Sequence, residues 1–136
     1  MKKLLIASII LIALGSLIIF LAINSNSGVT GNVISEGNSE VKKFVITGEN
    51  FKFMIDGVDN PDIEVNRGDK VRIEFTSTKG FHDWVVDEFN ATTKQVRETD
   101  DSTFVEFIAD KKGTFEYYCS VGKHRANGMK GNLIVK

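Results

Sequence analysis

From residue 42 onward, the chain alternates apolar and polar residues in short runs that end at turn residues. In one run Val71, Ile73 and Phe75 alternate with charged residues, which is typical of a strand with one buried and one solvated face. The runs predict strands at residues 43–47, 51–55, 62–66, 70–76, 81–86, 103–109, 113–119 and 130–135. The polar stretch at residues 87–102 has room for a loop or a short helix. Many short strands at this spacing predict an all-β fold, either a β-sandwich or a barrel.

The N-terminus has a different pattern, an almost uninterrupted apolar block at residues 4–23. A helix that spans a bilayer needs about 20 such residues. Lys2 and Lys3 precede the block, and no Lys or Arg lies between it and Lys42, so the positive-inside rule exports the rest of the chain. The alternative is a cleaved signal peptide, whose apolar region usually runs for about 7 to 15 residues. The length therefore favours a retained anchor, a single transmembrane helix at residues 1–23.

Between the two patterns lies a segment rich in Asn, Ser and Gly, residues 24–41. Such a composition predicts a flexible linker with a reach of roughly 20 to 25 Å. We expect its last residues either to stay in the linker or to add an edge strand to the fold. The chain then divides into a membrane anchor at residues 1–23, the linker at 24–41 and one domain at 42–136, a common size for a domain.

The charge is nearly balanced, with 17 Lys and Arg against 18 Asp and Glu and a formal net charge of −1. This balance gives no electrostatic footprint for nucleic acid, so we expect no nucleic-acid partner. The sequence also lacks the nucleophile elbow, the phosphate-binding loop and the zinc-protease helix that mark common enzyme classes. We expect a protein that is not an enzyme, and a monomer in the absence of any signal for assembly.

The residues with the strongest metal chemistry are Cys119, His124 and Met129, which follow one another at intervals of five residues. The only other histidine, His82, lies in a predicted strand, where alternation places it on the same face as Trp84. Singly, each of the four would more often be an ordinary core residue. A lone cysteine in an exported domain cannot form an internal disulfide, and ligation of a metal is one way to hold it.

The ligand types discriminate among metals. Thiolate and thioether sulfur are soft and favour copper, and imidazole serves both copper oxidation states. Methionine is a poor zinc ligand, and calcium and magnesium take oxygen ligands. A thiolate, two imidazoles and a thioether together indicate a blue copper site with one mononuclear ion that alternates between Cu(I) and Cu(II).

The C-terminal stretch from Gly113 through Cys119 and His124 to Met129 resembles the signature of the cupredoxins, the plastocyanin/azurin family of blue copper proteins. The turn at residues 65–71, followed by His82, resembles the family's first-histidine region. The resemblance implies a Greek-key β-sandwich with His82, Cys119 and His124 as equatorial copper ligands and Met129 as the axial ligand. It also implies that the ring edge of His124 reaches the surface through an apolar patch and passes the electron.

These observations predict a one-electron carrier tethered to the cytoplasmic membrane, with its domain on the extracytoplasmic side, in the periplasm or at the cell surface. Its partners would be redox proteins that donate and accept the electron, and its contact with the membrane would be the N-terminal helix. The alternative is a copper protein for storage, delivery or sensing, in which the metal is cargo. A third reading is a surface interaction module whose site is degenerate or filled with zinc.

Overall fold

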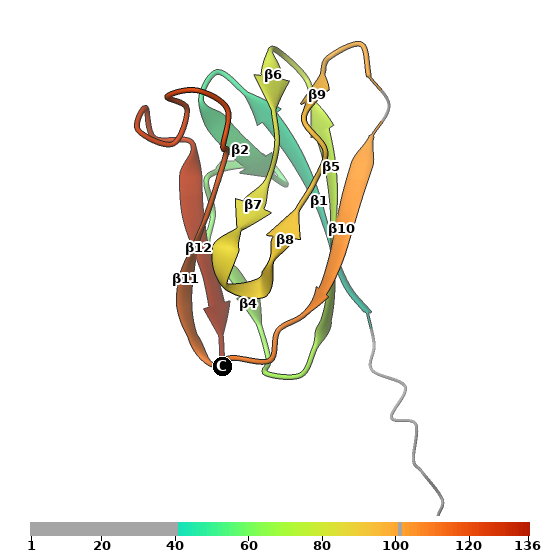
Figure 1. Ribbon diagram of the computed structural model, residues 1–136, viewed down its shortest axis with the longest axis vertical. Helices are drawn as coiled ribbons and strands as arrows, with labels where there is room; N and C mark the ends of the chain where they lie inside the picture. The colour runs from blue at the N-terminus through green and yellow to red at the C-terminus, as the bar shows by residue number, and fades with distance from the viewer. Residues whose placement is uncertain (1–40, 101) are drawn as a thin grey trace, which may run out of the picture. The chain divides into compact units, whose positions relative to one another are not determined.

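The computed structural model describes residues 41–100 and 102–136, so the predicted transmembrane helix and nearly all of the predicted linker lie outside the described residues. Within the described ranges, no helix is both long and apolar enough to cross a bilayer. The described residues form an all-β sandwich (Figure 1). The all-β fold predicted from the alternating pattern is therefore confirmed.

The first sheet contains five strands: β1 (Val41–Glu49), β2 (Lys52–Ile55), β3 (Val58–Asp59), β5 (Lys70–Ser77) and β10 (Thr103–Ile108). They lie in the order β10-β5-β1-β2-β3, with β1 parallel to β5 and the other neighbours antiparallel. Val41 pairs with Lys70 at one end of the sandwich, and β1 leads at the other end into the turn at residues 50–51. The chain therefore enters the domain at the end opposite this turn.

The second sheet contains five further strands: β4 (Ile63–Val65), β7 (Val85–Val86), β8 (Ala91–Thr92), β11 (Gly113–Tyr118) and β12 (Lys130–Val135). Their order is β4-β12-β11-β7-β8, with β4 parallel to β12. A separate pair consists of β6 (Phe81–His82) and β9 (Val96–Arg97), and a 3-10 turn, η1, covers Asp87–Phe89.

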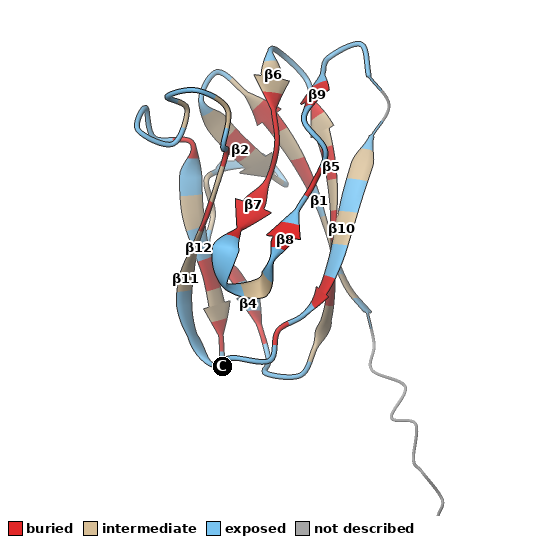
Figure 2. Ribbon diagram, viewed as in Figure 1, coloured by how far each residue is buried: buried red, intermediate tan, exposed pale blue. Residues whose placement is uncertain are grey.

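The buried residues, drawn red in Figure 2, form one core cluster, and its largest fully buried side chains are aromatic. Trp84 is fully buried and stacks between Tyr117 and Phe107, with ring centroids 5.7 and 6.2 Å away. Phe53 meets the edges of Tyr117 and Phe75 at centroid distances of 5.5 and 6.0 Å. Each such buried side chain stabilises the fold by about 1.5–3 kcal/mol.

The predicted strands agree with the structure to within two residues at their ends, except in four places. The two-residue strand β3 (Val58–Asp59) was not predicted. The first strand begins at Val41, earlier than predicted, and lies inside its sheet rather than at an edge. The irregular stretch at residues 87–102 contains η1 and the two short strands β8 and β9. The strand predicted at residues 81–86 is divided into β6 and β7.

The division of that strand has a packing cause. His82 and Trp84 are buried as alternation predicted, but Asp83 and Val85, on the expected wet face, are buried as well. Here β6 pairs with β9, whereas β7 pairs with both β8 and β11, so the segment changes its partner strands between His82 and Val85. Alternation distinguishes the faces of a strand only where one of them meets water.

Candidate metal centre

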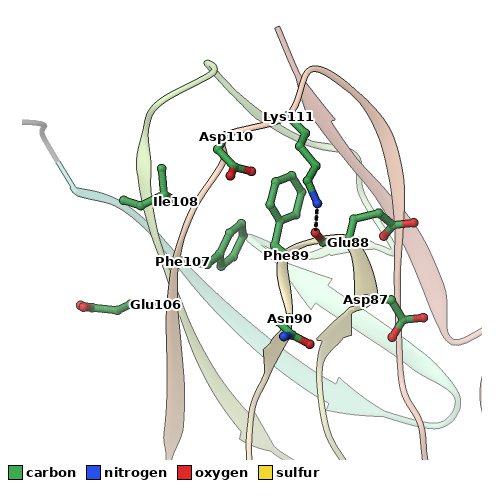
Figure 3. Close-up of a pocket in the computed structure, with 9 residues that line it drawn as sticks. All are labelled: Asp87, Glu88, Phe89, Asn90, Glu106, Phe107, Ile108, Asp110 and Lys111. Atoms are coloured by element: carbon green, nitrogen blue, oxygen red, sulfur yellow. Dashed lines mark hydrogen bonds between the residues drawn. The ribbon is translucent and has the colours of Figure 1, made fainter.

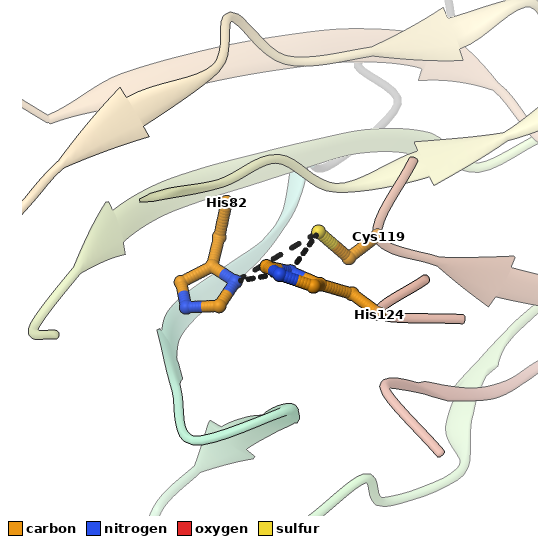
Figure 4. A group of neighbouring side chains, drawn as sticks. All are labelled: His82, Cys119 and His124. Carbon is orange, nitrogen blue, oxygen red and sulfur yellow. Dashed lines mark hydrogen bonds between the residues drawn. The ribbon is translucent and has the colours of Figure 1, made fainter. Parts of the chain in front are cut away.

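Three of the four predicted ligands meet at the end of the sandwich that carries the turn at residues 50–51. The Nδ1 atoms of His82 and His124 are 3.1 Å apart, and the sulfur of Cys119 lies 3.8 Å from the first and 3.5 Å from the second. All three side chains point toward one another (Figure 4). The fold therefore brings these three predicted ligands, from two distant parts of the sequence, into one cluster.

The separations fit a single ion with two nitrogen ligands and one sulfur ligand. Bonds of about 2.3 Å to sulfur and 2.0 Å to nitrogen, as measured for zinc, place the sulfur and nitrogen atoms roughly 3.3–3.8 Å apart at angles of about 100–120°. The observed distances from the sulfur to the two nitrogens are 3.5 and 3.8 Å. The donor set and its spacing therefore match the equatorial plane of a blue copper site.

His82 is held by the backbone next to it. Its Nε2–H donates to the carbonyl of Lys79 at 2.9 Å, and since a carbonyl can only accept, Nδ1 is left without a proton and faces the cluster. Burial lowers the pKa of His82, and the proximity of His124 lowers it further. The ring is therefore neutral at pH 7, as a metal ligand must be.

Cys119 directly follows β11 and is fully buried. Its N–H donates to the carbonyl of Met129 at 3.1 Å. Burial raises the pKa of the Cys119 thiol to about 11, so a metal must displace the proton before it can bind sulfur. The predicted inward orientation at a strand end is confirmed, although the strand stops one residue earlier than expected.

Asp83 joins the two ligand segments. Its carboxylate accepts hydrogen bonds from the N–H of Ser120 at 2.7 Å, from the hydroxyl of Ser120 at 2.5 Å and from the Gln95 amide at 3.3 Å. Since Asp83 follows His82 and Ser120 follows Cys119, these bonds fix the spacing of the two ligands. Hydrogen bonds to a charged acceptor are worth about 1.5–3 kcal/mol each.

The loop that carries His124 and Met129 is closed by its own backbone. The N–H of His124 donates to the carbonyl of Val121, and the N–H of Met129 donates to the carbonyl of His124, both at 3.0 Å. Gly128 has φ of 100°, a left-handed conformation that glycine adopts without strain. Met129 is fully buried, and its methyl group lies against Gly48 of β1, where an added Cβ would be 3.1 Å from it. Backbone hydrogen bonds therefore join Met129 directly to Cys119 and to His124.

A comparison with known families bears directly on this site. Residues 48–136 match the family described as copper binding proteins, plastocyanin/azurin family. The chain belongs to this family. Copper is accordingly the cofactor of this cupredoxin, as the donor set predicted.

Solved structures similar to this cupredoxin include other copper proteins. Rusticyanin from Thiobacillus ferrooxidans is 27% identical over 71% of this chain and 77% of that chain, with a TM-score of 0.58. Auracyanin A, a "blue" copper protein from Chloroflexus aurantiacus, is 22% identical over 71% of this chain and 99% of that chain, with a TM-score of 0.59. Auracyanin from Roseiflexus castenholzii is 24% identical over 70% and 97% of the two chains, also at 0.59. At these identities the auracyanins show a shared fold. No curated protein sequence matches the chain.

Reasoning from donor atoms overlooked three residues of the cupredoxin site. Asp83 ties the ligand segments together, Gly48 makes room for the Met129 methyl group, and Phe51 packs on His124 with ring centroids 5.0 Å apart. Asp83 did leave a signal, because it is an acidic residue inside an otherwise apolar run next to a predicted ligand. Gly48 and Phe51 are distant from the ligands in sequence and carry no metal chemistry, so only the fold reveals them.

A hollow of about 560 Å³ lies between η1 and the end of β10 (Figure 3). Lys111 crosses it to donate to the backbone carbonyl of Glu88 at 2.8 Å. None of the four predicted copper ligands lines it, and the carboxylate of Asp87 at its rim accepts from the hydroxyl of Tyr118. This hollow is therefore separate from the cluster of His82, Cys119 and His124.

Proposed function

We propose that this cupredoxin is a one-electron carrier in which His82, Cys119 and His124 bind one copper ion in a plane and Met129 binds it axially. The observation that carries the proposal is the convergence of the two Nδ1 atoms and the sulfur within 4.8 Å of one another at a buried cysteine. Bound copper would supply a reversible change between Cu(II) and Cu(I). The protein's part is to hold the donors still and to connect them to the surface.

The ligands have little freedom to rearrange. His82 donates a hydrogen bond to the carbonyl of Lys79, and Asp83 joins the segments of His82 and Cys119. The N–H of Cys119 donates a hydrogen bond to the carbonyl of Met129. Ligands that keep their places in both oxidation states lower the cost of moving an electron. This stiffness favours a carrier over a delivery protein, because delivery requires the site to open.

His124 offers the route to the surface. Its ring is half-buried, unlike His82 and Cys119, which are buried. One edge of the ring borders a hollow of about 280 Å³ that is lined mainly by apolar groups, including Phe51, Phe81 and Val121. Such a surface suits brief contact with a redox partner, and we propose that donor and acceptor proteins both dock here.

We further propose that residues 1–23 anchor the protein as a single transmembrane helix, with the copper domain on the extracytoplasmic side. The apolar N-terminal block and the two lysines before it support this topology. Val41 enters the domain at the opposite end of β1 from the residues that contact His124, and a nine-residue strand is roughly 25–30 Å long. An N-terminal tether would therefore leave His124 on the side of the domain farthest from its attachment. Extraction of native membranes with carbonate tests the anchor, and a shortened chain in the soluble fraction would disprove it.

The test of function is a spectrum and a voltammogram of the copper-loaded full-length chain. We expect an intense visible absorption from the thiolate–copper bond, its loss in Cys119→Ser, and a reversible one-electron wave with copper retained in both states. Met129→Leu should change the potential, whereas the matched control Met54→Leu, on β2 and outside the cluster, should not. Absence of the visible band would refute the carrier. Rapid transfer of Cu(I) to an acceptor would favour storage or delivery, the alternative function.

A further inference from the structure

The two histidines of the copper site are held in different ways. His82 is fixed by a hydrogen bond from Nε2 to the carbonyl of Lys79. The hydrogen bonds of the described residues include none to Nε2 of His124. From outside the cluster, Phe51 contacts the His124 ring edge to face, with centroids 5.0 Å apart and an interplanar angle of 79°.

Phe51 comes from a distant part of the chain, the two-residue turn between β1 and β2. Glu49 and Lys52 form the last pair of the hairpin, so Asn50 and Phe51 are the two turn residues. Both have positive φ, 44° and 63°, as in a type I′ turn. The second position of this turn strongly favours glycine, because a left-handed conformation brings a Cβ too close to the backbone.

Phenylalanine is therefore a poor choice for the turn itself. It is strained, and 45% of its surface is still exposed to water. Neither property benefits the hairpin, since glycine would remove both. The contact with His124 is the interaction that a glycine would lose.

The space around His124 shows what that contact prevents. Phe51 forms one wall of the hollow of about 280 Å³ that also borders His82 and His124. Without the ring of Phe51, this hollow would open further beside the imidazole. His124 would then have room to turn its Nδ1 away from the sulfur of Cys119, which now lies 3.5 Å away.

We propose that Phe51 is a positioning residue for the copper centre, whose ring holds the His124 imidazole in the orientation that aims Nδ1 at His82 and Cys119. The inference rests on copper binding at His124, as proposed above, and it is independent of any redox partner. Phe51 orients the ring of His124, as the Lys79 carbonyl orients the ring of His82. One ligand is oriented by a hydrogen bond and the other by an aromatic contact.

The test compares Phe51→Gly, Phe51→Tyr and a matched control in the full-length chain. The neighbouring turn between β2 and β3 has Asp56 and Gly57 at its two positions, with φ of 49° and 81°, so Asp56→Gly makes the same backbone change far from His124. The measurements are the rate at which a Cu(I) chelator removes copper, the reduction potential, and the melting temperature of the metal-free protein.

We expect Phe51→Gly to lose copper about tenfold faster and to shift in potential, while its metal-free melting temperature stays equal or rises. Phe51→Tyr should restore the slow rate, and Asp56→Gly should behave as the wild type. A Phe51→Gly protein with wild-type copper loss and potential would overturn the proposal, as would a Tyr variant that loses copper as fast as the Gly variant. If the wild type binds no copper at all, the proposed function fails instead, and the two failures are distinguishable.

Discussion

Removal of the Asp83 carboxylate should loosen the fold and the copper site together. In Asp83→Ala the N–H of Ser120 loses a 2.7 Å hydrogen bond at a place where Asp83 itself is only 1% exposed. The lost bond to a charged acceptor costs about 1.5–3 kcal/mol, and leaving the partly buried N–H without a partner adds to this cost. The hydroxyl of Ser120 and the amide of Gln95 can turn to water, because both residues are exposed. We expect a net loss of about 2–4 kcal/mol in the free energy of unfolding.

The substitution Asp83→Asn separates geometry from charge. The amide oxygen can still accept from the N–H of Ser120, so the stability loss should be near 1 kcal/mol, the difference between a charge-assisted bond and a neutral one. Ser120→Ala removes only the hydroxyl bond and should cost less than about 1 kcal/mol, since that side chain is exposed. In the copper-loaded protein, Asp83→Asn should raise the reduction potential, because loss of a negative charge near the site favours Cu(I).

The assay is urea unfolding of the metal-free full-length chain in mild detergent, followed by the fluorescence of Trp84. Trp84 is the only tryptophan and is fully buried in the core, so its emission reports the loss of the sandwich. Copper affinity measured against a competing chelator should fall about 10- to 100-fold in Asp83→Ala. An Ala variant within 0.5 kcal/mol of the wild type, or an Asn variant as unstable as the Ala variant, would refute the role assigned to the carboxylate.

Two further predictions concern the metal itself. Gly48→Ala would place a Cβ 2.8 Å from the Phe75 ring and 3.1 Å from the Met129 methyl. We expect a stability loss of about 1–3 kcal/mol, measured by thermal melting, and an altered reduction potential, measured by voltammetry. No change in either would show that Phe75 and Met129 can move to accommodate the added methyl group. Copper affinity should rise about tenfold per pH unit between about pH 7 and 9, because the Cys119 thiol releases one proton when it binds copper. Burial raises the pKa of this thiol to about 11, so the thiol is protonated throughout this range, and burial keeps His82 neutral. Chelator competition across this range checks the slope, and a pH-independent affinity would contradict it.

The fold was predictable where one side of a strand faces water. The strand at Lys130–Val135 agrees with its predicted bounds, and Lys70–Ser77 differs by one residue, because each shows clear alternation between core and solvent. The strand predicted at residues 81–86 was not resolved correctly, since Asp83 and Val85 are buried along with their neighbours. Alternation has no information about a segment that is covered on both sides. Sequence reasoning therefore predicts correctly that His82 is buried, but it misses the break after His82, where Asp83 accepts hydrogen bonds from Ser120.

In the candidate site, the metal-binding residue types could be predicted from the sequence, whereas the residues that support them could not. His82, Cys119 and His124 were identifiable because few residue types bind copper and the chain contains no others of those types. Their supports are a carboxylate, a glycine and a phenylalanine, which occur throughout the sequence in ordinary structural positions. What makes Gly48 special is a pair of neighbours far along the chain, the Phe75 ring and the Met129 methyl group, which lie 2.8 and 3.1 Å from the place where a Cβ would be.

The residues that support the predicted ligands come from two parts of the chain, the first hairpin and the segment around His82. Three of the four ligands follow β11 in one continuous stretch, so their mutual arrangement is mostly local. Gly48 and Phe51 belong to the first hairpin and touch Met129 and His124 across the sandwich. The proposed axial ligand Met129 and the half-buried His124 are thus the two proposed ligands that the first hairpin contacts, whereas His82 and Cys119 are held by Lys79 and Asp83. Changes in the hairpin should therefore alter the potential and the rate of copper loss while the buried pair keeps its place.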